Sequence, residues 1–401
     1  MEGYILDWFN LFFRWFHLIT GAAWIGTSFY FNWLNHNIRS PETPKDGIKG
    51  ELFAVHGGAF YQVLKYDGAP KVLPKTLHWF KWEAYFTWIT GICLLTVVYY
   101  WDTKIYLLQS TVGGLQPWQA IAISVGFITV SWLVYDLMCK SPLHKQPMFL
   151  AIIGLILLTI ASFALTRIYQ PRAAFMHVGV IIGTIMAANV FFVIIPNQRI
   201  MVDAMIAGQP PDISKGAAGA MRSLHNNYLT LPVLFIMLSN HYPMVFGHHL
   251  NWAILAGLSV ISMGVRHYFN LKHNGEHKVW ILPVAAVAMV ALALVSKPRP
   301  AEPFATSRPS GAHGARVTFQ QIQPILQVRC LSCHAAKPSF PGFQAPPQGI
   351  MLERYEQARA VHTKIKSSTV DSQYMPLGNL TKITPEERAL LGAWIQQGMP
   401  Q

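Results

Sequence analysis

Eight long runs of apolar residues occupy most of the chain, and shorter polar segments separate them. Each run approaches the ~20 residues that an α-helix needs to cross ~30 Å of hydrocarbon. The pattern therefore predicts an all-α membrane protein with about eight transmembrane helices. The predicted spans are Phe9–Leu34, Phe80–Trp101, Pro117–Met138, Met148–Thr166, Ala174–Ile195, Tyr228–Phe246, Leu250–Asn270 and Val279–Ser296.

The basic residues fall mainly in alternate loops between these runs. If the N-terminus lies outside the cytoplasm, the inside loops, counted together with Lys81 at the start of the second span, hold 14 Lys and Arg residues, whereas the outside segments between spans hold 3. This bias agrees with the positive-inside rule for membrane proteins. Because the number of spans is even, we expect the segment after the last span to lie outside as well.

The composition supports this interpretation. Hydrophobic residues make up 52% of the 401 residues and charged residues only 12%, against about 25% charged residues in soluble proteins. These values argue against a soluble enzyme of ordinary composition, a disordered chain and a collagen-like fibre. The net charge of +13 is accounted for by the inside loops, so we predict no nucleic-acid partner.

A proline-rich stretch, residues 297–316, follows the last apolar run and has no apolar periodicity. It predicts an extended linker between a membrane domain, residues 1–296, and a small soluble domain, residues 317–401. The last helix of that domain has a clear start, because Thr384 and Glu387 have the spacing of a capping box.

The strongest motif is Cys330-Leu331-Ser332-Cys333-His334. The pattern C-x-x-C-H is the attachment signature of a c-type haem, in which two thiols bind the porphyrin covalently and the histidine ligates the iron. A zinc site would require a second ligand pair at suitable spacing, and neither His313 nor His362 supplies one. We therefore predict covalent haem c in an all-α, class I cytochrome c domain.

The second axial ligand of this iron is expected downstream of His334. Met375 lies in a segment broken by proline and glycine, Tyr374-Met375-Pro376-Leu377-Gly378. A methionine in such a loop can reach the distal haem face, and Met/His ligation raises the reduction potential. We predict Met375 as this ligand; Met351 and Met399 are the other downstream methionines.

Ionisable residues inside predicted spans are costly and are functional candidates by default. His17 and His177 attract attention because they are 160 residues apart, as are Asn37 and Asn197. The offset suggests a parallel duplication of a four-helix unit, and two such histidines could bind a b-type haem. The alternative is that each bonds a neighbouring helix. Rival haem ligands are His241, His248 and His249; the remaining ionisable candidates are Arg14, Glu83, Asp136, Arg266 and His267.

A second group of candidates lies at the predicted cytoplasmic face. Residues 51–66 alternate around Gly57-Gly58, which predicts a β-hairpin with a tight turn. A flat anionic substrate requires arginine for charge, aromatic rings for stacking and an acid–base group. The candidates are Arg222, His56 and His78 for substrate binding, and Glu83 and His225 for catalysis. A solvated interfacial loop with aromatic residues is the alternative.

The sequence resembles a known family, the membrane-bound bacterial urate oxidases (urate hydroxylases) with a C-terminal cytochrome c. The resemblance covers nearly the whole chain. The segments that carry it are Arg14-Trp15-Phe16-His17, Ala54-Val55-His56-Gly57-Gly58-Ala59-Phe60-Tyr61, Leu77-His78-Trp79-Phe80-Lys81-Trp82-Glu83-Ala84-Tyr85, Leu224-His225-Asn226-Asn227-Tyr228 and the C-x-x-C-H motif.

The resemblance implies oxidation of urate to 5-hydroxyisourate with water as the oxygen source. Electrons would pass through haem c to a respiratory acceptor, such as a terminal oxidase or a soluble cytochrome. Haem c attachment outside the cytoplasm agrees with the charge pattern, so we expect a multi-pass protein of the bacterial inner membrane with a periplasmic cytochrome domain. Two other functions remain open: a membrane module that passes quinol electrons to the tail, and a transporter with an appended cytochrome.

Overall fold

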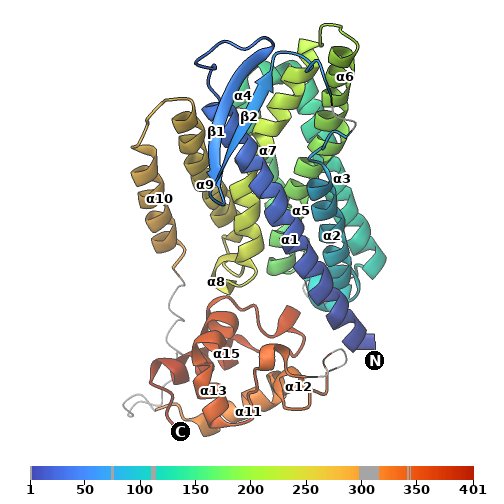
Figure 1. The fold of residues 1–401 in the computed structure, drawn as a ribbon. Helices are drawn as coiled ribbons and strands as arrows, with labels where there is room; N and C mark the ends of the chain where they lie inside the picture. The colour runs from blue at the N-terminus through green and yellow to red at the C-terminus, as the bar shows by residue number, and fades with distance from the viewer. Residues whose placement is uncertain (1, 74–75, 110–113, 298–315, 341–342, 344) are drawn as a thin grey trace.

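The computed structural model describes residues 2–73, 76–109, 114–297, 316–340, 343 and 345–401. A bundle of long helices forms one part, and a smaller group of short helices at one end of the bundle forms the other (Figure 1). Most of the predicted linker, 298–315, lies outside the described residues.

Every predicted apolar run is largely helical. The bundle helices are α1 (Glu2–Asn37), α2 (Trp82–Leu95), α3 (Pro117–Lys140), α4 (Pro147–Ile168), α5 (Pro171–Ala188), α6 (Ile195–Ile206), α7 (Ile213–Ser239), α8 (Pro243–Phe246), α9 (Asn251–His273) and α10 (Ile281–Val295). The segment η1 (Thr96–Tyr100) extends α2, and η4 (Asn189–Ile194) joins α5 to α6. Two further short helical segments are η2 (Thr103–Leu107) and η3 (Pro142–Lys145).

Four helical stretches in the described chain are long and apolar enough to cross a membrane, namely Trp82–Tyr100, Pro117–Lys140, Pro147–Ile168 and Pro171–Ile206. The helix α10 is apolar but shorter. The sixth predicted run is part of a longer helix, because α7 begins at Ile213, where the Asp212 carboxylate accepts a hydrogen bond from the Ser214 amide at 2.9 Å.

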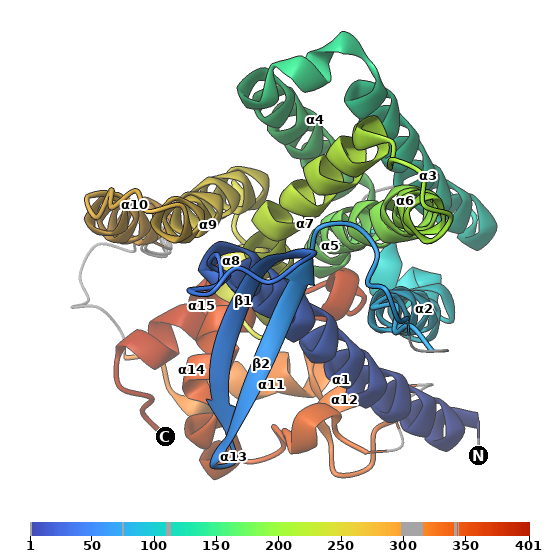
Figure 2. The same cartoon turned by 45° about the horizontal axis from the view of Figure 1, so that its top comes forward.

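The helix α5 forms the centre of the bundle. It packs against α2, α3, α4, α7 and α9, and Figure 2 shows it enclosed by its neighbours. Its side chains from Ala173 to Ala187 are mostly buried and continue the main apolar core. Polar residues on α5 therefore have to find partners on the surrounding helices.

The predicted β-hairpin is confirmed. The strands β1 (Ile48–His56) and β2 (Ala59–Tyr66) pair antiparallel, with His56 opposite Ala59. Gly57 and Gly58 form the turn with φ of 60° and 78°, the left-handed values that a two-residue hairpin turn of type I′ requires.

The C-terminal part has its own apolar core, centred on Leu391 and Trp394. The predicted start of its last helix is confirmed, because the Thr384 hydroxyl accepts a hydrogen bond from the Glu387 amide at 3.2 Å. Its helices are α11 (Phe319–Arg329), α12 (Leu331–His334), α13 (Tyr355–Ala360), α14 (His362–Ile365) and α15 (Pro385–Gln396), with short turns η5 (Pro347–Gly349), η6 (Lys366–Asp371) and η7 (Leu377–Asn379).

The two ends of the bundle differ. The start of α1 and the C-terminal domain lie at one end, whereas the hairpin and α6 lie at the other (Figure 1).

Candidate functional site

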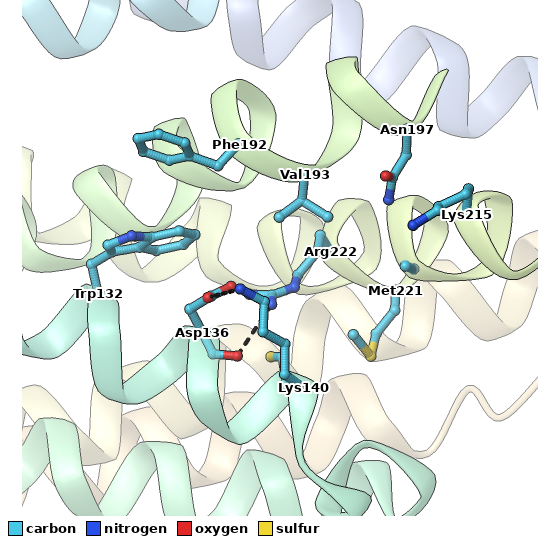
Figure 3. Close-up of a pocket in the computed structure, with 11 residues that line it drawn as sticks. Trp132, Asp136, Lys140, Phe192, Val193, Asn197, Lys215, Met221 and Arg222 are labelled. Carbon is cyan, nitrogen blue, oxygen red and sulfur yellow. Dashed lines mark hydrogen bonds and ion pairs between the residues drawn. The ribbon is translucent and has the colours of Figure 1, made fainter. Parts of the chain in front are cut away.

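A cavity of about 490 Å³ opens among α3, the α5–α6 continuation and α7 (Figure 3). It lies near the end of α3 that is remote from the C-terminal domain. Basic side chains outnumber acidic ones in its wall, and two aromatic rings contribute a flat surface. The lining residues are Trp132, Asp136, Cys139, Lys140, Phe192, Val193, Asn197, Lys215, Ala218, Met221 and Arg222.

Arg222 forms the floor of this cavity and is only 2% exposed. Its Nη2 donates to Asp136 Oδ1 at 2.7 Å, and its Nη1 donates to Asn189 Oδ1 at 3.1 Å. Lys140 pairs with the second oxygen of Asp136 at 2.6 Å. The positive charge of Arg222 is therefore compensated by the protein itself.

His225 lies one turn further along α7, in a network of polar side chains. Its Nδ1 is 2.8 Å from the Tyr135 hydroxyl. Asn189 donates through Nδ2 to Tyr135 at 3.0 Å and to Asn226 Oδ1 at 2.9 Å, and Asn226 donates to the Met186 carbonyl at 2.9 Å. Each member of this network has a partner, so it stabilises the contact between α3, α5 and α7.

The sequence grouped five candidate residues at this face, and the structure brings only Arg222 and His225 together. His56 lies at the exposed tip of the hairpin, and His78 packs edge-on against Phe80 with ring centroids 4.4 Å apart. Glu83 lies in the first turn of α2. Neither histidine nor Glu83 lines the cavity, because α2 and the hairpin approach the bundle from other sides.

Sequence reasoning missed two members of the network, Tyr135 and Asn189. Asp136 was identifiable as an acid within a span, but its partner was not. Asn189 is a single amide in an apolar run, which is the signal that could have indicated a buried polar contact.

The two histidines proposed as ligands of one shared haem b are not both free to bind an iron. His177 is fully buried, its Nδ1 is 2.7 Å from the Ala173 carbonyl, and its Nε2 is 2.7 Å from the Ser124 hydroxyl. His17 bonds the Thr87 carbonyl through Nδ1 at 2.9 Å, which leaves its Nε2. A haem iron requires a free ring nitrogen, and His177 has none. These contacts match the alternative in which each histidine bonds a neighbouring helix.

The C-x-x-C-H segment has a geometry suited to haem c. Cys330, at the α11–α12 junction, and Cys333, in α12, are free thiols, and burial raises the pKa of the Cys330 thiol to about 12. The Nδ1 of His334 is 2.9 Å from the Ile350 carbonyl. Such a contact orients the ring and leaves Nε2 for a metal. These residues fit the covalent attachment of haem c.

The loop that contains Met375 is held on both sides. The Met375 amide donates to the Ser368 carbonyl at 2.8 Å, and Arg388 donates to the Met375 carbonyl at 2.7 Å. The neighbouring Tyr374 packs edge-on against Phe246 of α8, with centroids 5.0 Å apart. The C-terminal domain therefore docks on the bundle through the loop of the predicted iron ligand.

The comparisons with known proteins give one match. No curated protein and no solved structure matches this chain. The family model described as urate oxidase N-terminal matches residues 3–297, which covers the whole helical bundle and most of the chain. The chain therefore belongs to the urate oxidase N-terminal family.

Proposed function

We propose that this protein is a membrane-bound urate oxidase that transfers electrons from urate to its own haem c. Membership of the urate oxidase N-terminal family, across residues 3–297, is the observation that carries the proposal. The overall reaction adds water to urate and releases two electrons and two protons, which yields 5-hydroxyisourate. Haem c, when bound, accepts one electron at a time, so two transfers serve each urate.

Two structural features support the cytochrome part of this proposal. The side chains of Cys330, Cys333 and His334 fit covalent haem c, and the loop of Met375 contacts the bundle through Tyr374. A haem bound by these residues would belong to the domain whose Met375 loop contacts the bundle that carries the family match. Electrons would then pass to a respiratory acceptor, a terminal oxidase or a soluble cytochrome.

The proposed location is the bacterial inner membrane. Eight helices would span it: α1, α2, α3, α4, α5, α7, α9 and α10. The 14:3 distribution of basic residues supports an orientation with the hairpin end in the cytoplasm and the cytochrome domain in the periplasm.

The two released protons require acceptors. Of the two bases proposed from the sequence, His225 belongs to the network beneath the cavity, whereas Glu83 lies apart from it. His225 is therefore the better supported candidate. Its contact with the Tyr135 hydroxyl offers a route by which a proton could leave the imidazole ring.

Redox spectroscopy of the purified full chain tests this proposal. Urate, added without oxygen, should reduce the covalent haem c, and Cys330→Ala or Cys333→Ala should abolish normal two-thioether attachment. Reduction by a quinol but not by urate would instead support the alternative, a module that passes quinol electrons to the tail.

A further inference from the structure

A second buried arginine, Arg266 of α9, faces α7 from the side opposite the cavity. It is 6% exposed, and its Nε donates to Asn227 Oδ1 at 2.8 Å. Asn227 itself is 1% exposed. The helices α1, α7 and α9 pack together at this position, so both side chains lie within protein and not at its surface.

Several donors around Arg266 have no partner within the described part of the chain. The Arg266 Nη2, the Asn227 Nδ2 and the Asn270 Nδ2 are buried and unpaired, as is the His273 Nδ1. Residues 266, 270 and 273 share one face of α9, because they are spaced by four and three positions. A buried polar group without a partner is unfavourable by about 1–3 kcal/mol, and more when it is charged. Three such amide and guanidinium nitrogens together indicate an absent acceptor.

The charge of Arg266 is also uncompensated. In the described chain it forms no salt bridge. Its guanidinium lies 4.3 Å from the centroid of the Phe29 ring of α1, which stabilises a cation but does not neutralise it. Tyr228 and His267 lie beside it and bond each other at 2.7 Å. A buried arginine of this kind requires an anion.

We propose that Arg266, Asn227 and Asn270 bind the planar oxopurine anion that the enzyme oxidises. The proposal rests on the function proposed above and assigns the substrate to this cluster instead of to Arg222. His225 bonds Tyr135 of α3 on the other side of α7, so it would accept the released protons indirectly and not by contact with the substrate. An oxopurine anion offers ring and carbonyl acceptors in one plane, which matches several donors that converge without a carboxylate. Arg222, by contrast, already has its charge compensated by Asp136.

The test uses the detergent-solubilised full chain and measures equilibrium binding of urate and, separately, reduction of haem c. Arg266→Gln should weaken urate binding by about 10- to 100-fold, since a hydrogen bond to a charged group is lost. Asn227→Asp keeps the acceptor for Arg266 but supplies the missing negative charge, so it should exclude urate to a similar extent. Arg199→Gln is the matched control, because Arg199 is an exposed arginine that also lies over an aromatic ring, Trp79.

The outcomes separate this inference from the proposed function. Urate binding unchanged in both Arg266→Gln and Asn227→Asp would overturn the site assignment, whatever haem c does. Equal binding of inorganic phosphate would overturn the assignment to an oxopurine and show a general anion site. Binding that depends on Arg266 in a protein whose haem c is not reduced by urate would support the site and refute the proposed oxidation.

Discussion

Arg222 of α7 and Arg266 of α9 are two buried arginines, and they differ in what surrounds them. Arg222 has Asp136 at 2.7 Å and Asn189 at 3.1 Å, so its charge and donors are satisfied. Arg266 has one amide acceptor, an aromatic ring and a set of unpaired donors. The cavity of about 490 Å³ lies beside the satisfied arginine. An open volume and an uncompensated charge are therefore separate signals in this protein, and they occur at different arginines.

The largest expected effect concerns Arg222. The change Arg222→Met leaves Asp136 in a mostly buried position with only the exposed Lys140 as partner, so it should lower the free energy of unfolding by about 3 kcal/mol. Thermal unfolding in detergent measures this loss. The double change Arg222→Met with Asp136→Asn should recover much of it; without such recovery, the pair is not the source of the stability.

Arg266→Met should behave differently from Arg222→Met. It removes an uncompensated buried cation, so the free energy of unfolding without urate should stay within about 1 kcal/mol of wild type or rise. The same unfolding measurement applies. A loss as large as that expected for Arg222→Met would contradict the proposed difference between the two arginines, because Arg266 would then be a structural residue.

The stabilisation of the folded protein by urate tests the site at Arg266 separately. A ligand at ten times its dissociation constant stabilises the folded state by about 1.4 kcal/mol. We expect this gain in wild type and in Arg199→Gln but not in Asn227→Asp. Scans with and without urate provide the measurement, and equal stabilisation of Asn227→Asp would place urate elsewhere.

The smallest effect is expected for a third arginine pair, in the C-terminal domain. Arg329 bonds both oxygens of Glu387 at 3.0–3.2 Å, and both side chains are 23% exposed. Burial would raise the pKa of Glu387, but hydrogen bonds from Arg329 and from the Thr384 amide outweigh burial and lower it from 4.5. Glu387→Gln should reduce the stability of this domain by about 1 kcal/mol at neutral pH.

The sign of the pH dependence follows from the lowered pKa of Glu387. Its contribution to stability is complete above the unfolded pKa and is lost as the pH falls through the lower, folded pKa. Wild type should therefore lose stability between about pH 5 and pH 3, and Glu387→Gln should lose less in that range. If wild type and Glu387→Gln lose stability equally over this pH range, Glu387 is not the cause of the loss.

The sequence was sufficient for the features that depend on local patterns. The hairpin turn at Gly57-Gly58 and the cap at Thr384 were predicted correctly, because each depends on a few adjacent residues. Helices were predicted in every apolar run, although α7 is longer than its apolar part. The C-x-x-C-H motif is equally local, and its residues have a suitable geometry.

The sequence was insufficient where partners come from distant helices. Arg222 and Asp136 are 86 positions apart and Arg266 and Asn227 are 39 apart, so nothing local shows which arginine is paired. The 160-residue offset between His17 and His177 suggested a shared haem, but the structure gives His17 a partner on α2 and gives both ring nitrogens of His177 partners on α5 and α3. His56 and His78 were grouped with Arg222 by predicted membrane face alone, and a face is too large to define a site.

Anaerobic titration of the purified full chain with urate, monitored through the absorption bands of haem c, tests directly whether urate supplies electrons to this haem. We expect urate to reduce the covalent haem c, with two haem groups reduced for each urate consumed. We also expect 5-hydroxyisourate to form without oxygen. A haem c that stays oxidised in the presence of urate, while a quinol or a small chemical reductant reduces it fully, would contradict the account.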